Sequence, residues 1–360
     1  MAPTEILSEQ HWRKFSEWLA PLGVRLGYLR GGMGKKEKKQ MLEGRVLIGT
    51  HALIQEGVEF SRLGLVVVDE QHRFGVEQRL ALRKKATQAV PHQLMMSATP
   101  IPRTLSMTYF ADLDVSTIDE LPPGRGAVTT KLAANARRDE VLSRIREACA
   151  EGQQAYWVCP VIEESKAGLR TALETYEKLC AELKTLRVAL LHGRMPAAEK
   201  TATMLAFQEN RIHVLVATTV IEVGVDVPNA SLMVIESAER FGLSQLHQLR
   251  GRIGRGARES VCILLYGELQ GTARERLKVI FENADGFEIA RRDLELRGPG
   301  EVLGERQSGA PLLRFADLER DKDLVDAAVR AAPDLIERDP GAARAHVARW
   351  LGSRRELAEA

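Results

Sequence analysis

The run from Val66 to Val68, followed by Asp69-Glu70-Gln71-His72, constrains the fold of this chain more than any other segment. Consecutive β-branched residues predict a short strand buried on both faces, as in a parallel sheet with helices on either side. The strand delivers two adjacent carboxylates to its carboxyl end. Beside a nucleotide phosphate, Asp69 can hold Mg²⁺ while Glu70 orients or deprotonates the attacking water. Gln71 and His72 are then candidate sensors of the γ-phosphate, with local packing as the alternative for His72.

Two hydroxyl-bearing segments follow the carboxylates along the chain. The tripeptide Ser97-Ala98-Thr99 ends the next predicted strand. The hydroxyls of Ser97 and Thr99 can hydrogen-bond the carboxylate loop, although a Ser-Ala-Thr tripeptide is more often an ordinary strand-to-turn transition. The later segment 218–226 places hydroxyls and a carboxylate around a glycine just after a strand. The hydroxyls suit a phosphodiester backbone, and the carboxylate can accept a hydrogen bond from a ribose hydroxyl. The candidate residues in this segment are Thr218, Thr219, Gly224 and Asp226.

A cationic segment closes the series. Gln248, Gly251, Arg252 and Arg255 fit the pattern Q-x-x-G-R-x-x-R. The two guanidinium groups lie one helical turn apart, and their planar forks suit the negative charge of a transferring phosphoryl group. A solvated basic helix face is the alternative. The order of the three motifs is typical of superfamily 2 nucleic-acid motors, which use ATP and Mg²⁺.

One part of such a motor is missing from the sequence. No segment fits G-x-x-x-x-G-K-[ST], the loop whose backbone N–H groups and lysine bind nucleotide phosphates. The nearest candidate, Gly34-Lys35-Lys36, lacks a hydroxyl residue after the lysine, and Leu29 stands where the first glycine is needed. We therefore interpret the chain as the C-terminal part of a larger enzyme, through truncation, an alternative start or a split gene. We expect the chain alone to have weak ATP hydrolysis or none.

Composition limits the classes of protein that fit. With 51 Lys and Arg against 49 Asp and Glu, the formal charge is only +2, so any phosphate contacts must come from local placement. The four cysteines are far apart and form no C-x-x-C pair, which argues against a zinc site or a disulfide framework. A reducing cytosol fits this pattern. The longest apolar runs are of strand length, so we expect a cytoplasmic protein without a membrane span.

The chain divides into three predicted parts. Strand-like runs alternate with amphipathic stretches up to a cluster of proline and glycine at 121–126, after which the alternation restarts. Beyond about Gly271 the strand signals end, and helical periodicity takes over. We predict an α/β motor domain at 1–121, a second α/β domain at 122–269 and a helical tail at 270–360.

The combined motifs resemble those of the RecG branched-DNA helicases. The resemblance rests on four segments and continues through 118–125 into the tail, so it covers essentially the whole chain. The four segments are Met1-Ala2-Pro3-Thr4-Glu5-Ile6-Leu7, Gly49-Thr50-His51-Ala52-Leu53-Ile54-Gln55, Asp69-Glu70-Gln71-His72-Arg73-Phe74-Gly75-Val76 and Ser97-Ala98-Thr99-Pro100-Ile101-Pro102-Arg103-Thr104.

The resemblance implies two RecA-like parallel-sheet motor domains, the first incomplete, followed by a helical tail that contains a helical hairpin. It implies ATP-driven remodelling of branched double-stranded DNA, such as stalled forks and Holliday junctions, in repair and recombination. A monomer is expected, with single-stranded DNA-binding protein as a partner. Residues 286–309 are expected to link motor closure to movement. The implied DNA-binding and coupling residues are Pro3, Thr4, Ser97, Thr99, Thr218, Thr219, Arg297 and Gln307, and the implied nucleotide contacts are Asp69, Glu70, Gly224, Asp226, Arg252 and Arg255.

Two alternatives stay open at this point. The chain could be a duplex translocase that resembles the transcription-repair coupling factor and moves without unwinding. It could also be a non-catalytic fragment that binds DNA or a partner, which the missing phosphate-binding loop favours for the isolated chain.

Overall fold

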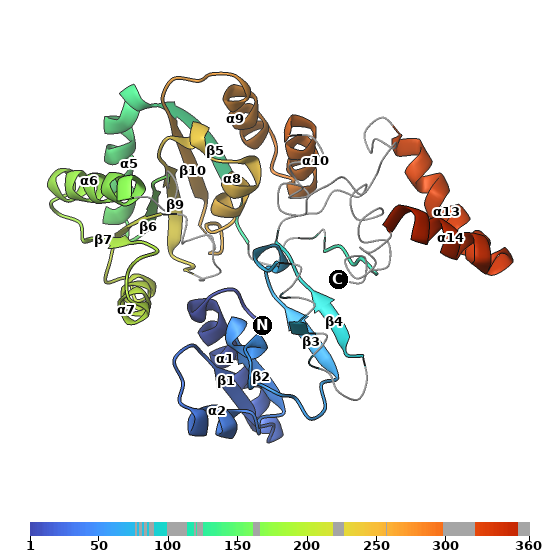
Figure 1. Ribbon diagram of the computed structural model, residues 1–360. Helices are drawn as coiled ribbons and strands as arrows, with labels where there is room; N and C mark the ends of the chain where they lie inside the picture. The colour runs from blue at the N-terminus through green and yellow to red at the C-terminus, as the bar shows by residue number, and fades with distance from the viewer. Residues whose placement is uncertain are drawn as a thin grey trace.

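The structure is a computed structural model of the 360-residue chain. It describes all residues except 76–77, 79–80, 83–84, 86–89, 99–113, 119, 121–124, 161–165, 219–226, 257, 298–320 and 352–360. Five of the candidate site residues lie outside the described residues: Thr99, Thr219, Gly224, Asp226 and Gln307. The second half of the implied coupling segment 286–309, from residue 298 on, also lies outside them. Three regions follow one another along the chain (Figure 1).

The first domain is built from short parallel strand pairs. Its helices and strands are α1 (Glu5–Leu19), β1 (Leu26–Leu29), α2 (Lys35–Met41), β2 (Val46–Gly49), β3 (Leu65–Val68) and β4 (His92–Met95), with short 3-10 helices at Ala20–Leu22, His51–Ile54 and Gln71–Arg73. β1 pairs with β2, and β3 pairs with β4. Met1 and Ala2 lie between the two pairs, since the Ala2 N–H donates to the Gly49 carbonyl (2.9 Å) and the Asp69 N–H donates to the Met1 carbonyl (3.0 Å).

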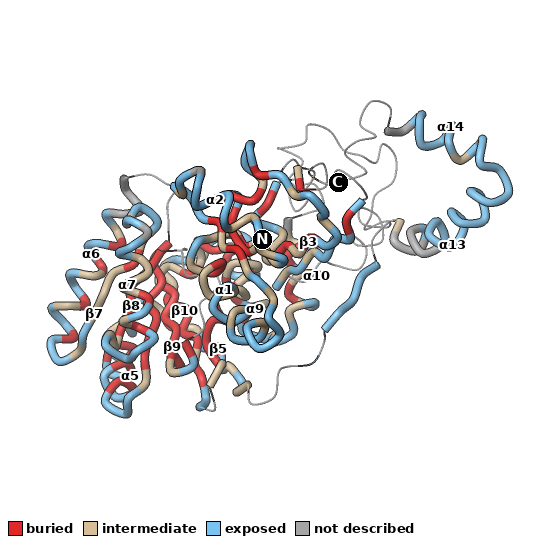
Figure 2. Tube along the Cα trace, turned by 90° about the horizontal axis from the view of Figure 1, so that it is seen from below, coloured by how far each residue is buried: buried red, intermediate tan, exposed pale blue. Residues whose placement is uncertain are grey.

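The second domain is one six-stranded parallel sheet with the order β5-β10-β9-β6-β8-β7. Its elements are β5 (Val128–Ala134), α5 (Arg138–Ala150), β6 (Gln154–Val158), α6 (Lys166–Glu182), β7 (Val188–Leu191), α7 (Ala197–Gln208), β8 (Val214–Ala217), β9 (Ala230–Ile235), α8 (Leu243–Arg250) and β10 (Ser260–Tyr266), with 3-10 helices at Asn135–Arg137 and Ala238–Arg240. Every residue of β6, β8 and β9 is buried, because a hydrophobic core lies on each face of the sheet. Figure 2 shows this concentration of buried residues.

The tail is helical, with α9 (Thr272–Glu282), α10 (Gly286–Arg297), α13 (Lys322–Arg338) and α14 (Pro340–Leu351). α9 and α10 pack against each other and against α8. α13 and α14 pack on each other and extend away from the two domains, with mostly exposed surfaces (Figures 1 and 2). None of the described helices is both long enough and apolar enough to span a membrane.

The fold class predicted from the sequence is confirmed, with two parallel α/β regions and a helical C-terminal region. The predicted strand runs correspond to β2, β3, β4 and β6 to β10, whereas β1 and β5 are not predicted. The numerical domain boundaries stay predictions.

Candidate functional site between the two domains

Asp69 lies directly after β3 and is held by the first helix. His11, two turns into α1, places its Nε2 atom 2.8 Å from Oδ2 of Asp69, and the Glu70 N–H donates to Oδ1 (2.9 Å). The hydrogen bond from His11 holds the pKa of Asp69 below its ordinary value, despite partial burial. Asp69 is therefore ionised at neutral pH, as a ligand for a hard cation must be.

Glu70 has an unusual backbone conformation. Its φ of 50° and ψ of 52° lie in the left-handed region, which a non-glycine residue adopts only at an energetic cost. The largely buried side chain meets the second domain, where Oε1 lies 3.7 Å from the Arg252 guanidinium. Its other oxygen is 3.5 Å from Nδ1 of His72 and accepts from the Ala98 N–H at 3.5 Å. The strained turn thus brings a carboxylate from the first domain to an arginine of the second.

His72 contacts both domains. Its Nδ1 atom lies 3.4 Å from the Ser97 hydroxyl, and its Nε2 atom lies 3.4 Å from the side-chain nitrogen of Gln248 on α8. Burial lowers the pKa of His72, so the ring is neutral at neutral pH. A neutral ring can donate to Ser97 from Nδ1 and accept from Gln248 at Nε2. His72 therefore packs between two motifs and also joins the two domains.

The arginine segment follows α8, which ends at Arg250, so the prediction that Arg252 and Arg255 lie one turn apart on a helix is wrong. The chain turns there instead. Arg252 is buried, with its side chain 7% exposed, and Arg255 is partly buried. Between them Gly254 adopts φ +78°, and a Cβ atom there would lie 2.6 Å from Val128. Glycine is therefore required at this turn on both conformational and steric grounds.

The remaining described candidates lie at the ends of elements. Pro3 precedes α1, and Thr4 caps it by accepting from the Leu7 N–H (3.4 Å). Thr218 follows β8, is buried, and donates its N–H to the Leu191 carbonyl (3.2 Å). Gln71 donates its N–H to the Met96 carbonyl (2.9 Å). Gly251 accepts from Arg125 at its carbonyl (3.0 Å), and Arg297 ends α10. The structure thus gathers six candidates into one site: Asp69, Glu70, His72, Ser97, Gln248 and Arg252.

Sequence reasoning missed two residues of this region. His11 stands seven residues after Thr4, so helical periodicity places it two turns from the helix start, but a lone histidine carries no signal of its partner. Arg250 is buried and donates to the carbonyl of Ile280 near the end of α9 (2.9 Å) and to those of Asn283 (2.8 Å) and Ala284 (3.1 Å) in the α9–α10 connection. The sequence could have pointed to Arg250, because this arginine lies inside the Q-x-x-G-R-x-x-R segment.

The carboxylates suit Mg²⁺ in particular. Within the part of the chain that the structure describes, no cluster of three or more His, Cys, Asp or Glu side chains could hold a metal ion. Magnesium fits such a site, because it commonly takes one or two carboxylates and completes its shell with water and substrate phosphates. Asp69 and Glu70 would supply that carboxylate contact.

Comparisons with known proteins agree with this geometry. Family profiles match residues 1–108 (DEAD/DEAH box helicase), 138–257 (helicase conserved C-terminal domain) and 283–357 (ATP-dependent DNA helicase RecG, domain 3, C-terminal). The ATP-dependent DNA helicase RecG of Acidithiobacillus ferridurans is 55% identical over 98% of this chain and 53% of its own length. The RecG of Escherichia coli strain K12 is 54% identical over 98% of this chain and 52% of its own length.

Solved structures give the same result. RecG bound to a three-way DNA junction is 45% identical, with a TM-score of 0.69, over 90% of this chain and 43% of that one. Saccharomyces cerevisiae Dbp5 bound to RNA and ADP BeF3 shares the fold at 18% identity, with a TM-score of 0.61 over 82% of this chain and 79% of that one. The chain spans about half the length of the curated relatives it matches. Over that span, the chain belongs to the RecG family of ATP-dependent DNA helicases.

Proposed function

We propose that this chain is the motor portion of an ATP-dependent DNA helicase that remodels branched double-stranded DNA in repair and recombination. The observation that carries the proposal is the approach of Glu70 to Arg252 at 3.7 Å, across two separate α/β domains. A carboxylate and a guanidinium that meet in this way can act on one phosphoryl group only while the domains are together. Nucleotide state and domain closure are thereby linked.

Each residue of the site has a distinct chemical role in this proposal. Asp69 would hold Mg²⁺, which supplies neutralisation of phosphate charge when bound. Glu70 would orient or deprotonate the attacking water, and Arg252, with Arg255, would stabilise the negative charge that spreads over the transferring group. Gln248 and His72 would report whether the domains are closed. Gly224 and Asp226 are proposed to contact the nucleotide ribose and its surroundings.

The tail is proposed to convert closure into movement along DNA. Arg250 ties α8, which leads into Arg252, to three carbonyls at the end of α9 and in the α9–α10 connection. Ser244 of α8 also donates to Asp293 of α10 (2.8 Å). A shift of α8 on closure would therefore be transmitted to α9 and α10 through these hydrogen bonds.

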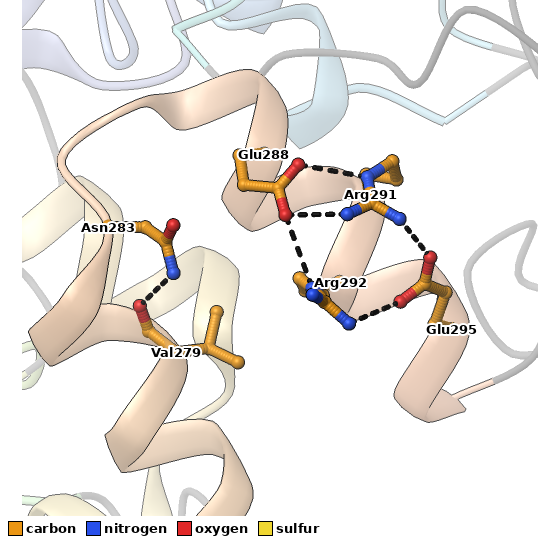
Figure 3. A network of polar contacts seen from close by, with 6 residues as sticks. All are labelled: Val279, Asn283, Glu288, Arg291, Arg292 and Glu295. Carbon is orange, nitrogen blue, oxygen red and sulfur yellow. Dashed lines mark hydrogen bonds and ion pairs between the residues drawn. The ribbon is translucent and has the colours of Figure 1, made fainter.

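Two arginines on the surface of α10 are already paired with carboxylates. Arg291 and Arg292 both pair with Glu288 and Glu295 on the same helix (Figure 3). Four ion pairs within one helix favour an internal network over a phosphate-binding patch.

Arg297 and Gln307 are proposed to continue this coupling. The residues proposed to contact the DNA backbone are Pro3, Thr4, Ser97, Thr99, Thr218 and Thr219. By family resemblance we further propose a cytoplasmic monomer that works with single-stranded DNA-binding protein.

The test uses a fusion in which the part of the Acidithiobacillus ferridurans relative that this chain does not span is placed ahead of residue 1. We expect DNA-dependent ATP hydrolysis and unwinding of a three-way junction by the fusion, and weak hydrolysis by the chain alone. ATP hydrolysis without strand displacement would favour the duplex translocase. DNA binding without hydrolysis would favour the non-catalytic fragment.

The coupling role has its own test in the same fusion. Arg297→Ala or Gln307→Ala should preserve most DNA-dependent ATP hydrolysis and abolish unwinding. A proportional loss of both activities, or no loss of either, would leave the tail with a structural role only.

A further inference from the structure

The chain contains two copies of one sequence pattern. Residues 68–78 read V-D-E-Q-H-R-F-G-V-E-Q, and residues 235–245 read I-E-S-A-E-R-F-G-L-S-Q. Both have an apolar strand end, a carboxylate, three variable residues, Arg-Phe-Gly, an apolar residue, one variable residue and glutamine. The first copy follows β3 and carries the site carboxylates, whereas the second follows β9 in the other domain.

The backbone repeats as closely as the sequence. Glu70 and Ser237 are both non-glycine residues in the left-handed region, with φ 50° and ψ 52° at the first and φ 50° and ψ 50° at the second. Each is followed by a three-residue 3-10 helix and then a buried phenylalanine. In both copies the next glycine donates its N–H to the glutamine side chain three residues on, at 3.1 Å. The two segments are therefore the same structural turn.

The two turns differ in what surrounds the carboxylate. Asp69 has one side-chain partner among the hydrogen bonds described above, His11. Glu236, at the equivalent position, accepts from Arg138 (2.7 Å), the Trp157 indole N–H (2.8 Å) and the Thr175 hydroxyl (3.3 Å). The Cys159 thiol, directly after β6, also donates to it weakly (3.8 Å). The Arg138 guanidinium also stacks on the Trp157 ring, 4.5 Å from its centroid. In the second domain the guanidinium of Arg138 thus lies against the carboxylate of Glu236. In the first domain Mg²⁺ is proposed to take the corresponding place beside Asp69.

We propose that Glu236 is a positioning residue for the arginine segment, a role that rests on the proposed function. The donors to Glu236 come from α5, β6 and α6, so its carboxylate joins three elements of the domain to the end of β9. The left-handed Ser237 and the 3-10 helix then lead directly into α8, which ends just before Arg252. Fixing the turn fixes where α8 begins.

Hydrophobic packing alone does not set this position. Leu243, Leu246 and Leu249 are fully buried and determine which face of α8 points into the core. Such packing tolerates small shifts along the helix axis better than a network of directional hydrogen bonds does. A shift of about 1 Å in a catalytic group can cost on the order of a hundredfold in rate. The polar network therefore supplies the precision that Arg252 needs.

The first test uses hydrogen exchange on the chain itself. Glu236→Gln keeps the shape but removes the charge from the acceptor of these hydrogen bonds. Amides of the turn and of the first turn of α8, at Arg240, Phe241 and Leu246, should exchange about tenfold faster, the effect of losing a charge-assisted hydrogen bond. Amides of α7 should not change. Equally faster exchange throughout the domain would mean a plain structural role, and unchanged exchange at the turn would overturn the proposal.

Two further variants make this comparison specific. Glu239→Gln makes the same chemical change on the same turn, but its oxygen accepts only from the Gly267 N–H among the hydrogen bonds found (3.3 Å), a bond that glutamine can keep. It should leave exchange at all three amides unchanged. If Glu236→Gln fails to fold, Thr175→Val removes one donor with little change of shape and should give a smaller increase at the same amides. No increase in Thr175→Val would then contradict the proposal.

The second test separates this inference from the proposed function. In the fusion, Glu236→Gln should lower kcat about tenfold to a hundredfold and leave the KM for ATP unchanged, because Arg252 is displaced from the transition state. A fusion without ATP hydrolysis would count against the proposed function. An active fusion with unchanged kcat in Glu236→Gln would count against the positioning role alone.

Discussion

The two α/β domains differ in how completely their strands are buried. In the first domain, Leu65 of β3 and Leu94 of β4 are 59% and 50% exposed, and the described strands form two separate pairs. In the second, six strands form one continuous sheet, and every residue of β6, β8 and β9 is buried. The carboxylates thus lie on the less buried domain, whereas Gln248 and Arg252 come from the more fully buried one. A well-buried domain behind the arginines and a less buried one behind the carboxylates suit a site that opens and closes.

The largest expected effect tests whether both domains are needed for catalysis. In the fusion, Glu70→Gln should keep ATP binding and lose hydrolysis, because an amide cannot take a proton from water. Arg252→Ala or Arg255→Ala should lower turnover by roughly a thousandfold or more, the range seen when an arginine finger is removed. Steady-state ATP hydrolysis with saturating DNA measures turnover in all three variants, and equilibrium ATP binding is measured separately for Glu70→Gln. Unchanged turnover in both arginine variants would place the catalytic cation elsewhere.

Proteolysis tests the difference in stability directly. We expect limited digestion of the chain to remove the first domain early and to leave a resistant core that starts near residue 125 and ends beyond Leu265. The physical reason is the exposed apolar surface and unpaired strand edges of the first domain. Mass spectrometry of the fragments identifies the core. Equal survival of residues 1–120 would remove the contrast between the domains.

Acid should weaken the second domain through His247. Burial lowers the pKa of this histidine to about 4, and Arg250 donates to its Nδ1 atom (3.2 Å). In the unfolded chain the pKa is near the usual value of about 6.5. The unfolded state therefore binds more protons between these values, so stability falls as the pH drops from about 6.5 to about 4, by at most about 3 kcal/mol.

The variant His247→Asn isolates this effect, because its side-chain oxygen can replace Nδ1 as acceptor without titrating. Urea unfolding of the second-domain core at pH 7 and pH 4.5 should show a smaller loss of stability in the variant than in the parent. An equal loss in both proteins would assign the acid sensitivity to other groups.

The Arg138 contacts predict a smaller change in the same domain. Arg138→Ala leaves Glu236 without its cation and removes the stacking on Trp157. Because both charged side chains are about a quarter exposed, we expect a loss of about 2 kcal/mol, below the range for fully buried pairs. The neighbouring Arg137 pairs with Glu140 on the surface, so Arg137→Ala is a matched control. A similar loss of stability in both variants would contradict the assigned role of the network.

Sequence patterns predicted the elements of the site better than its contacts. The strand before Asp69 follows from a local residue pattern, because burial and periodicity are local properties. The spacing of Arg252 and Arg255 predicts a helix, but the chain leaves the helix at Arg250. The approach of Glu70 to Arg252 joins residues far apart in sequence, and only the resemblance to known motors implied it. The contacts of His11 and Glu236 depend on neighbours from other elements, which no local pattern encodes. The repeated turn was visible in the sequence, since comparing the chain with itself aligns Arg-Phe-Gly at both sites.

The smallest effect concerns the strain shared by the two turns. A left-handed conformation costs a non-glycine residue about 1–2 kcal/mol. Replacing the residue by glycine removes this cost, but the greater freedom of glycine in the unfolded chain offsets part of the stabilisation. Ser237→Gly should therefore stabilise the second domain by about 0.5–1 kcal/mol. Asn210 also has a positive φ (58°), but asparagine tolerates this region, so Asn210→Gly should stabilise the domain less.

In the first domain Glu70→Gly should relieve the same strain and yet abolish ATP hydrolysis in the fusion. Urea unfolding and ATP hydrolysis of the variants measure the two outcomes. A loss of stability in Ser237→Gly would show that the serine side chain, and not the backbone, holds the second turn, and the equivalence of the two turns would then fail.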